Sequence, residues 1–462
     1  MDLKYHSTRG KTRDVEFLDA VMMGMASDGG LLLPQEFPQV ANKLQEWAAL
    51  SYVDLAFEVM KLYVTDVPSA DLKSILEKSY GTFRHQEVTP IKALKNEVIL
   101  ELFHGPTLAF KDVALQFLGE VFDYALKKRG GHLNILGATS GDTGSAAIAG
   151  VRGKGSINIF VMHPKGRTSP IQELQMTSIL DQNVHNMAID GTFDDCQHIL
   201  KTLFNDLEFK QQYHLGAVNS VNWARILAQV VYYFYAYFRV EPGCQEKRTF
   251  VVPTGNFGDI FAGYVAASMG LPVEQLTLAT NENNILERFF NTGVYERGAV
   301  VHSISPSMDI QVASNFERYL YSLLQGDHER LVGLMKGFAE GGRIEFGSGP
   351  VPGLIKAGSG STQETLKTIQ DVYKEDGYLL DPHTAVGVGV SRKLRQESGS
   401  KTKAPICLAT AHPSKFPQDI ADLLGPGLAT HPEIDQLEGL PTRCHDLPND
   451  AQKVKEFVKE RA

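Results

Sequence analysis

The chain has 462 residues, of which 43% are hydrophobic and 21% charged, and its formal net charge is −9. This length and composition predict at least two globular domains with large cores, and the acidic balance argues against a nucleic-acid-binding protein. The longest apolar stretch, residues 226–238, is too short to span a bilayer, so no membrane association is predicted.

The first hundred residues contain turn signals and one stretch of helical apolar spacing, residues 47–63. A buried strand is predicted at residues 98–102, followed by a bend at residues 104–106, which have the sequence His-Gly-Pro. Cations in the last turn and two following glycines predict a helix over residues 112–129. Lys111 therefore lies where a bend enters a helix.

From residue 133 onward, short β-rich runs alternate with helical ones. Strands are predicted at residues 133–136, 157–162, 184–189, 215–218, 249–252, 275–279 and 405–409, and helices at 142–151, 170–180, 192–206, 223–238 and 258–269. This alternation predicts an α/β fold with mainly parallel sheets that are covered on both faces. Residues 341–361 are rich in Gly and Ser and are interpreted as a surface connection.

Two glycine-rich turns, residues 137–144 and 255–259, each join a predicted strand to a predicted helix. Helix N-termini carry free N–H groups and a positive dipole end, so either turn could bind an anion. Hydroxyl groups add donors to the first turn, whereas Gly255 and Gly258 allow a phosphate to approach the second closely. The first turn has neither a Walker A lysine nor a dinucleotide fingerprint. The first turn is equally consistent with a structural role, with Asp142 as a helix cap, and the second turn taken alone favours a structural role.

Lys111 is the candidate nucleophile. A buried lysine has its pKa lowered toward neutrality and can then act as a nucleophile and as an acid or base. Leu108, Phe110 and Val113 could supply the apolar surroundings. The alternative is an exposed lysine beside Asp112, although cations are disfavoured at helix N-termini. A lysine in an apolar bend, combined with two anion-binding turns, predicts an aldehyde cofactor with a phosphate tail, namely pyridoxal phosphate.

Further candidates lie at the ends of predicted elements. Asn222 and Arg225 lie one turn apart at a helix start and could bind an anionic substrate, or Asn222 could cap the helix. Thr410 follows a strand at the edge where open α/β sheets bind ligands. The basic turn around Lys165 could steer phosphate or be a solvated loop. The 14 histidines show no metal-ligand spacing, so no metal site is predicted.

Taken together, these motifs resemble the threonine synthase family of fold-type II pyridoxal-phosphate enzymes, in the branch found in many bacteria and in fungi. The matching segments are residues 7–10, 27–30, 101–107, 110–112, 137–147, 219–227, 253–264, 305–309, 381–385 and 409–413. The resemblance implies a tryptophan-synthase-β-like architecture of two α/β domains with an N-terminal extension. Its expected parts are an N-terminal region (1–100), a large domain (101–133 and 220–462) and a smaller domain (134–219).

The resemblance also implies a role for each candidate residue. Lys111 would form a Schiff base with pyridoxal 5'-phosphate, and Thr410 would meet the pyridine nitrogen. The cofactor phosphate would lie in the turn formed by Gly255, Asn256, Phe257, Gly258 and Asp259. The substrate carboxylate would be bound by Thr139, Ser140, Gly141, Asp142 and Thr143. Because a leaving phosphate needs clustered donors and cations, Ser220, Asn222 and Arg225 are its candidate ligands, with Lys165 as a further candidate.

The implied reaction converts O-phospho-L-homoserine and water to L-threonine and phosphate, by γ-elimination of phosphate and β-addition of water. Its alternative is a phospho-lyase on the same scaffold, which gives a 2-oxo acid, ammonia and phosphate. A non-catalytic anion-binding protein is disfavoured by the intact Lys111 and both intact turns. Four distant cysteines and an N-terminus without a signal-peptide pattern predict a cytoplasmic protein. A monomer or a homodimer is expected.

Overall fold

Two mainly parallel β-sheets organise the computed structural model, which describes residues 3–139, 141–399 and 403–462. The six-stranded sheet has the order β13-β10-β9-β14-β4-β3, and only its edge strand β3 is antiparallel to its neighbour. The five-stranded sheet, β15-β7-β6-β5-β8, is parallel throughout. The predicted α/β architecture with mainly parallel sheets is therefore confirmed.

The predicted strands lie close to β4 to β10 and β14, whereas β1 to β3, β11 to β13 and β15 were not predicted. The six-stranded sheet contains β3 (Ile91–Ala93), β4 (Val98–Glu101), β9 (Arg248–Pro253), β10 (Val273–Thr280), β13 (Ile355–Ser359) and β14 (Ile406–Ala409). The five-stranded sheet contains β5 (Leu133–Ala138), β6 (Ile157–Pro164), β7 (Val184–Asp190), β8 (Leu215–Gly216) and β15 (His445–Pro448). Two antiparallel pairs join β1 (Tyr5–Ser7) to β2 (Leu32–Pro34) and β11 (Val294–Glu296) to β12 (Arg343–Glu345).

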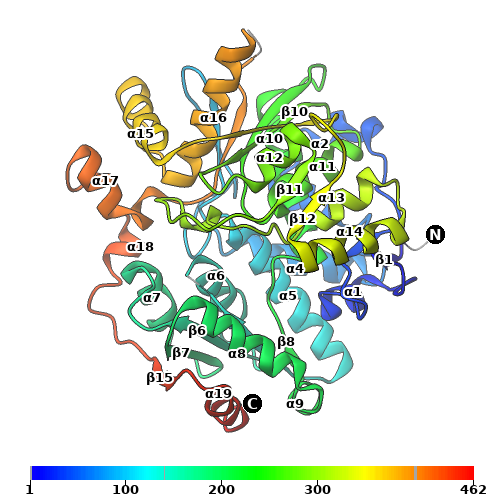
Figure 1. Ribbon diagram of the computed structural model, residues 1–462, viewed down its shortest axis with the longest axis vertical. Helices are drawn as coiled ribbons and strands as arrows, with labels where there is room; N and C mark the ends of the chain where they lie inside the picture. Colours follow the sequence, from blue (N-terminus) through cyan, green and yellow to red (C-terminus); the bar gives the residue numbers. More distant parts are fainter. Residues whose placement is uncertain (1–2, 140, 400–402) are drawn as a thin grey trace.

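Helices cover the sheets. In chain order they are α1 (Phe17–Met23), α2 (Leu44–Trp47), α3 (Tyr52–Met60), α4 (Ser69–Tyr80), α5 (Lys111–Arg129), α6 (Asp142–Val151), α7 (Pro170–Thr177), α8 (Phe193–Asn205), α9 (Leu207–Gln212), α10 (Trp223–Val240), α11 (Gly258–Ser268), α12 (Ile285–Thr292), α13 (Phe316–Leu323), α14 (His328–Gly341), α15 (Thr362–Asp376), α16 (Pro382–Ser398), α17 (Pro417–Leu424), α18 (Pro432–Asp435) and α19 (Ala451–Lys459). Short 3₁₀ turns are η1 (Ala41–Lys43), η2 (Pro306–Met308) and η3 (Pro413–Lys415). In Figure 1 the five-stranded sheet and its helices form the lower part of the molecule, and α10 to α13, α15 and α16 lie in the upper part.

Helix α10 is the central support of the larger part. It is buried along nearly its entire length and packs against α3, α5 and α11. A helix that is apolar on all sides belongs in a core, which explains the run of aromatic residues in its second half. The N-terminal helices α1, α3 and α4 pack on α5 or α10. Within the described ranges, no helix is long and apolar enough to cross a membrane.

Two predictions about the later part of the chain are wrong. The Gly- and Ser-rich residues 341–361 are not only a surface connection, because β13 lies among them and pairs in parallel with β10. The last residues do not complete the larger part, because β15 pairs with β7 in the five-stranded sheet and α19 packs on α8. Val454 and Phe457 bury their side chains in the apolar cluster of that sheet. The smaller part therefore gains a C-terminal strand and helix.

Candidate active site

A tight bend, residues 105–110, delivers Lys111 to the first position of α5. Asp112 holds this bend, since its carboxylate accepts hydrogen bonds from the Thr107 N–H and hydroxyl, each at 2.8 Å. Leu108 has a left-handed backbone with φ of 59°, which is rare for a branched residue. The Phe110 N–H donates to the Thr410 carbonyl, and the His412 N–H donates to the Leu108 carbonyl. The end of β14 therefore fixes the backbone that carries Lys111.

Burial governs the charge of Lys111. Its side chain is 13% exposed, so the alternative of an exposed lysine is wrong. Burial lowers the pKa of this ammonium to about 8. Asp142 raises that pKa, whereas Lys415 and Arg225 lower it further. Near pH 8 a large share of Lys111 is the neutral amine, the form that acts as a nucleophile or base.

Asp142, the first residue of α6, faces two lysines, Lys111 at the start of α5 and Lys415 in η3. Its Oδ1 lies 2.8 Å from Lys415 Nζ, and its Oδ2 lies 3.9 Å from Lys111 Nζ. Burial opposes the ionisation of Asp142, but Lys415 and Lys111 outweigh it, so the pKa of this carboxyl lies well below its usual range. The residue before it, Gly141, caps α6 without a side-chain hydrogen bond. Asp142 is therefore a buried ionic group rather than a helix cap.

The turn that follows β5 is closed by its own threonine. The Thr139 Oγ1 accepts hydrogen bonds from the N–H groups of Gly141 at 3.1 Å and Gly144 at 3.0 Å. Gly141 has φ of 144°, and a Cβ there would lie 2.3 Å from Gln172 Oε1. Thr143 lies in the first turn of α6, next to Asp142. The candidate residue Ser140 lies outside the described residues.

The turn that follows β9 is held open by aromatic packing and by one asparagine. Phe257 adopts a left-handed backbone with φ of 64° and caps α11. Its ring stacks on Phe290 and meets Phe316 edge-on. The Asn256 carbonyl accepts hydrogen bonds from the Asn315 N–H at 3.0 Å and Nδ2 at 3.2 Å. Strain of this kind persists where packing over-determines the backbone, as at ligand clamps.

Glycine is required in this turn because its surroundings are tight. A Cβ at Gly255 would lie 2.7 Å from the Ser307 carbonyl oxygen, and a Cβ at Gly258 would lie 3.2 Å from Asn315 Nδ2. The N–H groups of Gly258 and Asp259 open α11, where a helix has no carbonyl partners of its own. These features fit a cradle for a phosphate group.

Asp259 turns its carboxylate away from that cradle and into the core. Its Oδ1 accepts hydrogen bonds from the hydroxyls of Tyr232 at 2.5 Å and Tyr233 at 2.9 Å, both on α10. Burial raises the pKa of Asp259 to about 6, against the two tyrosine hydrogen bonds that lower it. Only the backbone of Asp259 is thus available to an anion at the start of α11.

The three candidate phosphate ligands near α10 differ in their availability. Arg225 is 4% exposed, and its Nε and Nη1 have no hydrogen-bond partner among the described residues. Burial lowers its pKa to about 10, so it stays charged at neutral pH. Asn222 instead caps α10 through its Oδ1 and donates to the Val21 carbonyl at 2.8 Å. The Ser220 hydroxyl pairs with Ser314.

Two remaining candidates occupy different settings. Thr410 is buried, and its N–H donates to the Thr384 hydroxyl at 3.2 Å, next to the bend that carries Lys111. Lys165 is 54% exposed and forms an ion pair with Asp446 on β15. The structure thus joins Thr410 to the centre and gives Lys165 a surface partner instead.

Several residues of the site escaped the sequence interpretation. Lys415 follows the quoted motif by two positions in η3, where its only signal is a lysine beside Pro413 and Phe416. Ser307 donates its N–H to His383 Nε2 at 3.2 Å, and His383 Nδ1 lies 3.1 Å from Asp381. His383 Nε2 therefore accepts the Ser307 N–H, and Nδ1 faces the Asp381 carboxylate. Asn315 and its fully buried neighbour Arg318 support the turn at Asn256.

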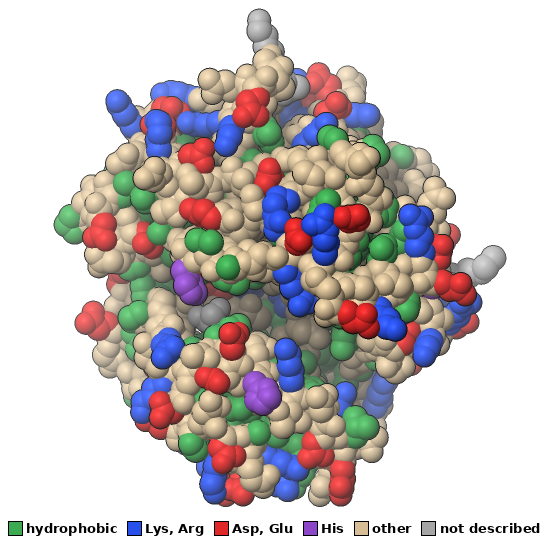
Figure 2. Space-filling view, viewed as in Figure 1, with side chains coloured by type: hydrophobic (Ala, Val, Ile, Leu, Met, Phe, Trp, Pro, Cys, Tyr) green, Lys and Arg blue, Asp and Glu red, His purple; other side chains and the backbone are tan. Residues whose placement is uncertain are grey.

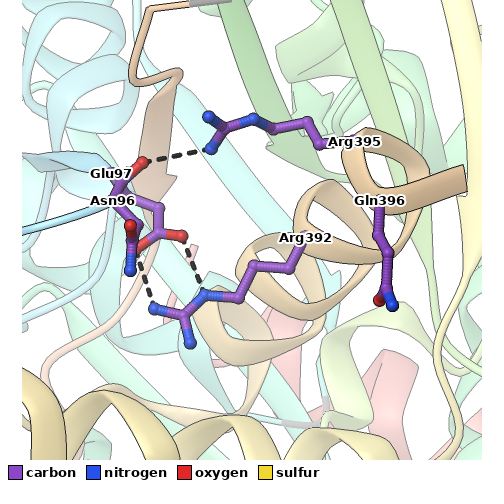
Figure 3. A pocket seen from close by; sticks show the side chains of 5 residues that line it. All are labelled: Asn96, Glu97, Arg392, Arg395 and Gln396. Atoms are coloured by element: carbon purple, nitrogen blue, oxygen red, sulfur yellow. Dashed lines mark hydrogen bonds and ion pairs between the residues drawn. The ribbon is translucent and has the colours of Figure 1, made fainter. Parts of the chain in front are cut away.

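Two concave regions are not lined by Lys111, Asp142 or Lys415. One of about 310 Å³ is lined by Asn96, Glu97, Arg392, Arg395 and Gln396 (Figure 3). Glu97 precedes β4, so this pocket lies at the amino end of the sheet, opposite the edge where α/β proteins bind ligands. Its Glu97 carboxylate already pairs with Arg392. A second, of about 350 Å³, lies against Leu108 and His412, behind the Lys111 bend.

The arrangement can hold an aldehyde cofactor that carries a phosphate. It supplies a buried amine with a lowered pKa, a glycine cradle that a Cβ would fill, and a buried guanidinium short of partners. No group of three or more His, Cys, Asp or Glu side chains that could hold a metal ion occurs in the part of the chain that the structure describes. In the view of Figure 2, a hollow separates the lower part of the molecule from the upper part.

Comparisons with known proteins agree with this chemistry. Family models match residues 4–80 (Threonine synthase N terminus), 84–337 (Pyridoxal-phosphate dependent enzyme) and 384–458 (Threonine synthase, C-terminal). The threonine synthase of Pseudomonas aeruginosa is 46% identical over 466 residues, which cover 99% of this chain and 98% of that protein. That of Schizosaccharomyces pombe is 46% identical over 455 residues, which cover 90% of this chain and 88% of that protein.

Solved structures give the same result. The PLP-bound threonine synthase from Brucella melitensis matches with a TM-score of 0.94 at 45% identity and covers 99% of both chains. The threonine synthase from yeast matches with a TM-score of 0.93 at 41% identity and covers 100% of this chain and 98% of that chain.

Proposed function

The chain belongs to the threonine synthase family of pyridoxal-phosphate dependent enzymes, and from this premise we propose how its own residues form threonine. The substrate we propose is O-phospho-L-homoserine, which reacts with water to give L-threonine and phosphate. The observation that carries this proposal is the pairing of a buried Lys111 of lowered pKa with a buried Arg225 that lacks partners for its Nε and Nη1. An amine base beside an unsatisfied guanidinium suits an amino acid that bears a phosphate.

Three groups would hold the cofactor. Lys111 would attach its aldehyde carbon, the backbone N–H groups of residues 255–259 would bind its phosphate, and Thr410 would meet its pyridine nitrogen. When bound, pyridoxal phosphate withdraws electrons from the bonds to the substrate Cα. The support for the phosphate assignment is the tight packing of Gly255 against Ser307 and the diversion of the Asp259 carboxylate into the core.

Lys111 would also move the protons. As a neutral amine it can accept the proton from Cα, and once it has released that proton it can accept the proton from the adjacent Cβ, since one amine reaches both carbons on one face. The ammonium so formed can return a proton at Cγ after phosphate leaves. A pKa of about 8 suits this double role, because both protonation states are populated near neutral pH.

Two anion sites would orient the substrate. The turn of Thr139, Gly141, Asp142 and Thr143 would bind the α-carboxylate through backbone N–H groups and the Thr143 hydroxyl. Arg225 would bind the leaving phosphate, with Ser220 beside it. Asn222 acts in this proposal by fixing the start of α10, and hence Arg225, rather than by touching substrate. Charge-assisted hydrogen bonds from Arg225 are worth about 1.5–3 kcal/mol.

Product analysis tests the function. Purified protein with pyridoxal phosphate and O-phospho-L-homoserine should release phosphate and threonine in equal amounts. Phosphate matched by 2-oxobutyrate and ammonia would instead identify the phospho-lyase. Arg225→Met should lower kcat/KM by about 10- to 100-fold, whereas Asn222→Ala should change it far less. Equal losses in both variants would contradict the proposed phosphate role of Arg225.

The wider organisation is also proposed. We assign residues 134–219 together with 445–459 to the smaller domain, and the rest of the chain from residue 101 to the larger one, on which residues 1–100 pack. The support is the pairing of β15 with β7. The four cysteine thiols are free, which suits a reducing cytoplasm. Analytical ultracentrifugation would decide between a monomer and a homodimer.

A further inference from the structure

Two buried lysines compete for one carboxylate at the centre of the site. Lys415 Nζ lies 2.8 Å from Asp142 Oδ1, whereas Lys111 Nζ lies 3.9 Å from Asp142 Oδ2. The side chain of Lys415 is fully buried, and that of Asp142 is 5% exposed. A buried carboxylate forms its strongest ion pair at the shorter, hydrogen-bonded distance. Asp142 therefore forms its main ion pair with Lys415, and its contact with Lys111 is longer.

Lys415 also joins three segments that meet at Lys111. Besides Asp142 at the start of α6, its Nζ donates to the Thr107 carbonyl at 2.9 Å. Thr107 belongs to the bend that delivers Lys111, and Lys415 itself lies in η3 just beyond β14. One ammonium thus connects the β4–α5 bend, the end of β14 and the turn of the smaller part.

The remaining contacts of Asp142 are neutral. Gln172 Nε2 donates to Oδ1 at 2.9 Å, and the Ser307 hydroxyl lies 3.5 Å from Oδ2. His383 on α16 also acts electrostatically on Asp142. The charged groups that face Lys111 are Asp142 from α6, Lys415 from η3, Arg225 from α10 and Asp112 from its own helix. Of the two carboxylates, Asp112 already accepts two hydrogen bonds from Thr107.

We propose that Lys415 is a positioning residue that takes up the charge of Asp142 and thereby leaves the amine of Lys111 free to react. Without Lys415, the nearest cation to the Asp142 carboxylate is Lys111. Lys111 and Asp142 would then form a close ion pair, and Lys111 would be held as an ammonium that is neither a nucleophile nor a base. This inference rests on the proposed role of Lys111.

The inference has a measurable consequence for covalent attachment of the cofactor. An amine condenses with an aldehyde only in its neutral form, with loss of one water molecule. Lys415 lowers the pKa of Lys111, so its loss should raise that pKa. In Lys415→Met, the pH profile for attachment should move upward, and attachment at pH 7 should slow about tenfold. Lys415→Arg keeps the charge and should retain the wild-type midpoint.

The test uses the full chain freed of cofactor. Pyridoxal phosphate is added between pH 6 and 10, its attachment rate is followed by absorbance, and the linkage to Lys111 is verified by borohydride reduction and peptide mass spectrometry. Lys127→Met is the matched control, because Lys127 is a 71% exposed lysine of the same helix in an ion pair with Asp123. Circular dichroism verifies the fold of each variant.

The outcomes separate the possible roles. The proposal is supported if the midpoint pH for attachment rises in Lys415→Met and returns toward the wild-type value when Asp142→Asn is added. The second change removes the competing carboxylate. A uniform loss of rate with an unchanged midpoint would overturn it and leave Lys415 a purely structural role. If Lys415→Met does not fold, Lys415→Gln is expected to show the same shift and is judged by the same criterion. Failure of the wild-type protein to form threonine would instead contradict the proposed function.

Discussion

Two aspartates at the first turns of two helices have pKa values that are shifted in opposite directions. Asp142 opens α6 after β5, and Asp259 opens α11 after β9, each next to a glycine. Asp142 points toward Lys415 and Lys111, and its pKa is lowered, whereas Asp259 points toward Tyr232 and Tyr233, and burial raises its pKa to about 6. The same local motif therefore forms an ion pair with lysine in one place and a tyrosine-bonded carboxyl of raised pKa in the other.

The difference explains how the two turns divide the chemistry. The α11 turn can receive a doubly charged phosphate because its own carboxylate is withdrawn into the core. The α6 turn keeps a carboxylate at the reacting centre and needs Lys415 to neutralise it. Tertiary partners, rather than the turn sequence, decide which arrangement forms.

The largest expected effect comes from removing one member of the ionic pair. Asp142→Leu leaves the buried ammonium of Lys415 without a carboxylate and should lower the free energy of unfolding by about 3–5 kcal/mol. The double variant Asp142→Leu, Lys415→Met removes both charges and should recover much of that loss. Urea denaturation measures both. A double variant that is no more stable than Asp142→Leu would contradict the paired account.

The pH dependence of stability separates the two aspartates. Asp259 has a folded pKa of about 6, above its ordinary 3.8, so folding favours its protonated form. Stability from this group should fall as pH rises from about 4 to 6, by about 3 kcal/mol. Asp142 has a lowered folded pKa, so its contribution is present above pH 4 and is lost as pH falls below it.

Asn substitutions make this contrast testable. Asp259→Asn should remove the loss of stability between pH 4 and 6, and Asp142→Asn should reduce the acid sensitivity below pH 4. Urea unfolding across pH 3 to 7 measures both effects. The comparison would be refuted if Asp259→Asn changed the stability only below pH 4 and Asp142→Asn changed it only between pH 4 and 6.

The glycines of the two turns allow a smaller, matched test. Gly255→Ala places a Cβ 2.7 Å from the Ser307 carbonyl, whereas Gly137→Ala, at the end of β5, meets no atom within 4 Å. Overpacking costs about 1–3 kcal/mol, so Gly255→Ala should weaken pyridoxal phosphate binding by about 10- to 100-fold. Gly137→Ala should bind it as the wild-type protein does. Equilibrium dialysis measures the dissociation constant of pyridoxal phosphate for both variants. Equal affinities would contradict the proposal that residues 255–259 bind the cofactor phosphate.

The smallest effect is expected at the start of α10. Asn222→Ala removes a helix cap and should cost about 1 kcal/mol of stability. Thermal unfolding with and without pyridoxal phosphate would measure it. A much larger loss, confined to the cofactor-bound protein, would show that Asn222 belongs to the ligand site instead.

Local patterns in the sequence predicted the features that depend on near neighbours. The predicted helix over residues 112–129 ends where α5 ends, because the signal for its C-terminus is local in the sequence. Only its start differs, by one residue. Asn222 as a cap was one of two interpretations, and the structure supports it. Lys111 and the two glycine turns were recognised because their residue types and order are unusual together.

Features set by distant partners could not be predicted. The direction of the Asp259 carboxylate depends on tyrosines of α10, and the charge of Asp142 depends on Lys415 in η3. Strand β15 has only four residues, with Asp446 and Pro448 exposed, and its pairing with β7 shows that it is part of a sheet. The glycine and serine residues around β13 predict a surface connection, whereas β13 pairs in parallel with β10.

The most direct test of the whole account asks which buried lysine carries the cofactor. The protein is loaded with pyridoxal phosphate, reduced with borohydride, digested and mapped by mass spectrometry. The division of roles between the two lysines predicts a pyridoxyl group on Lys111 and an unmodified Lys415. A pyridoxyl group on Lys415, with Lys111 unmodified, would contradict it.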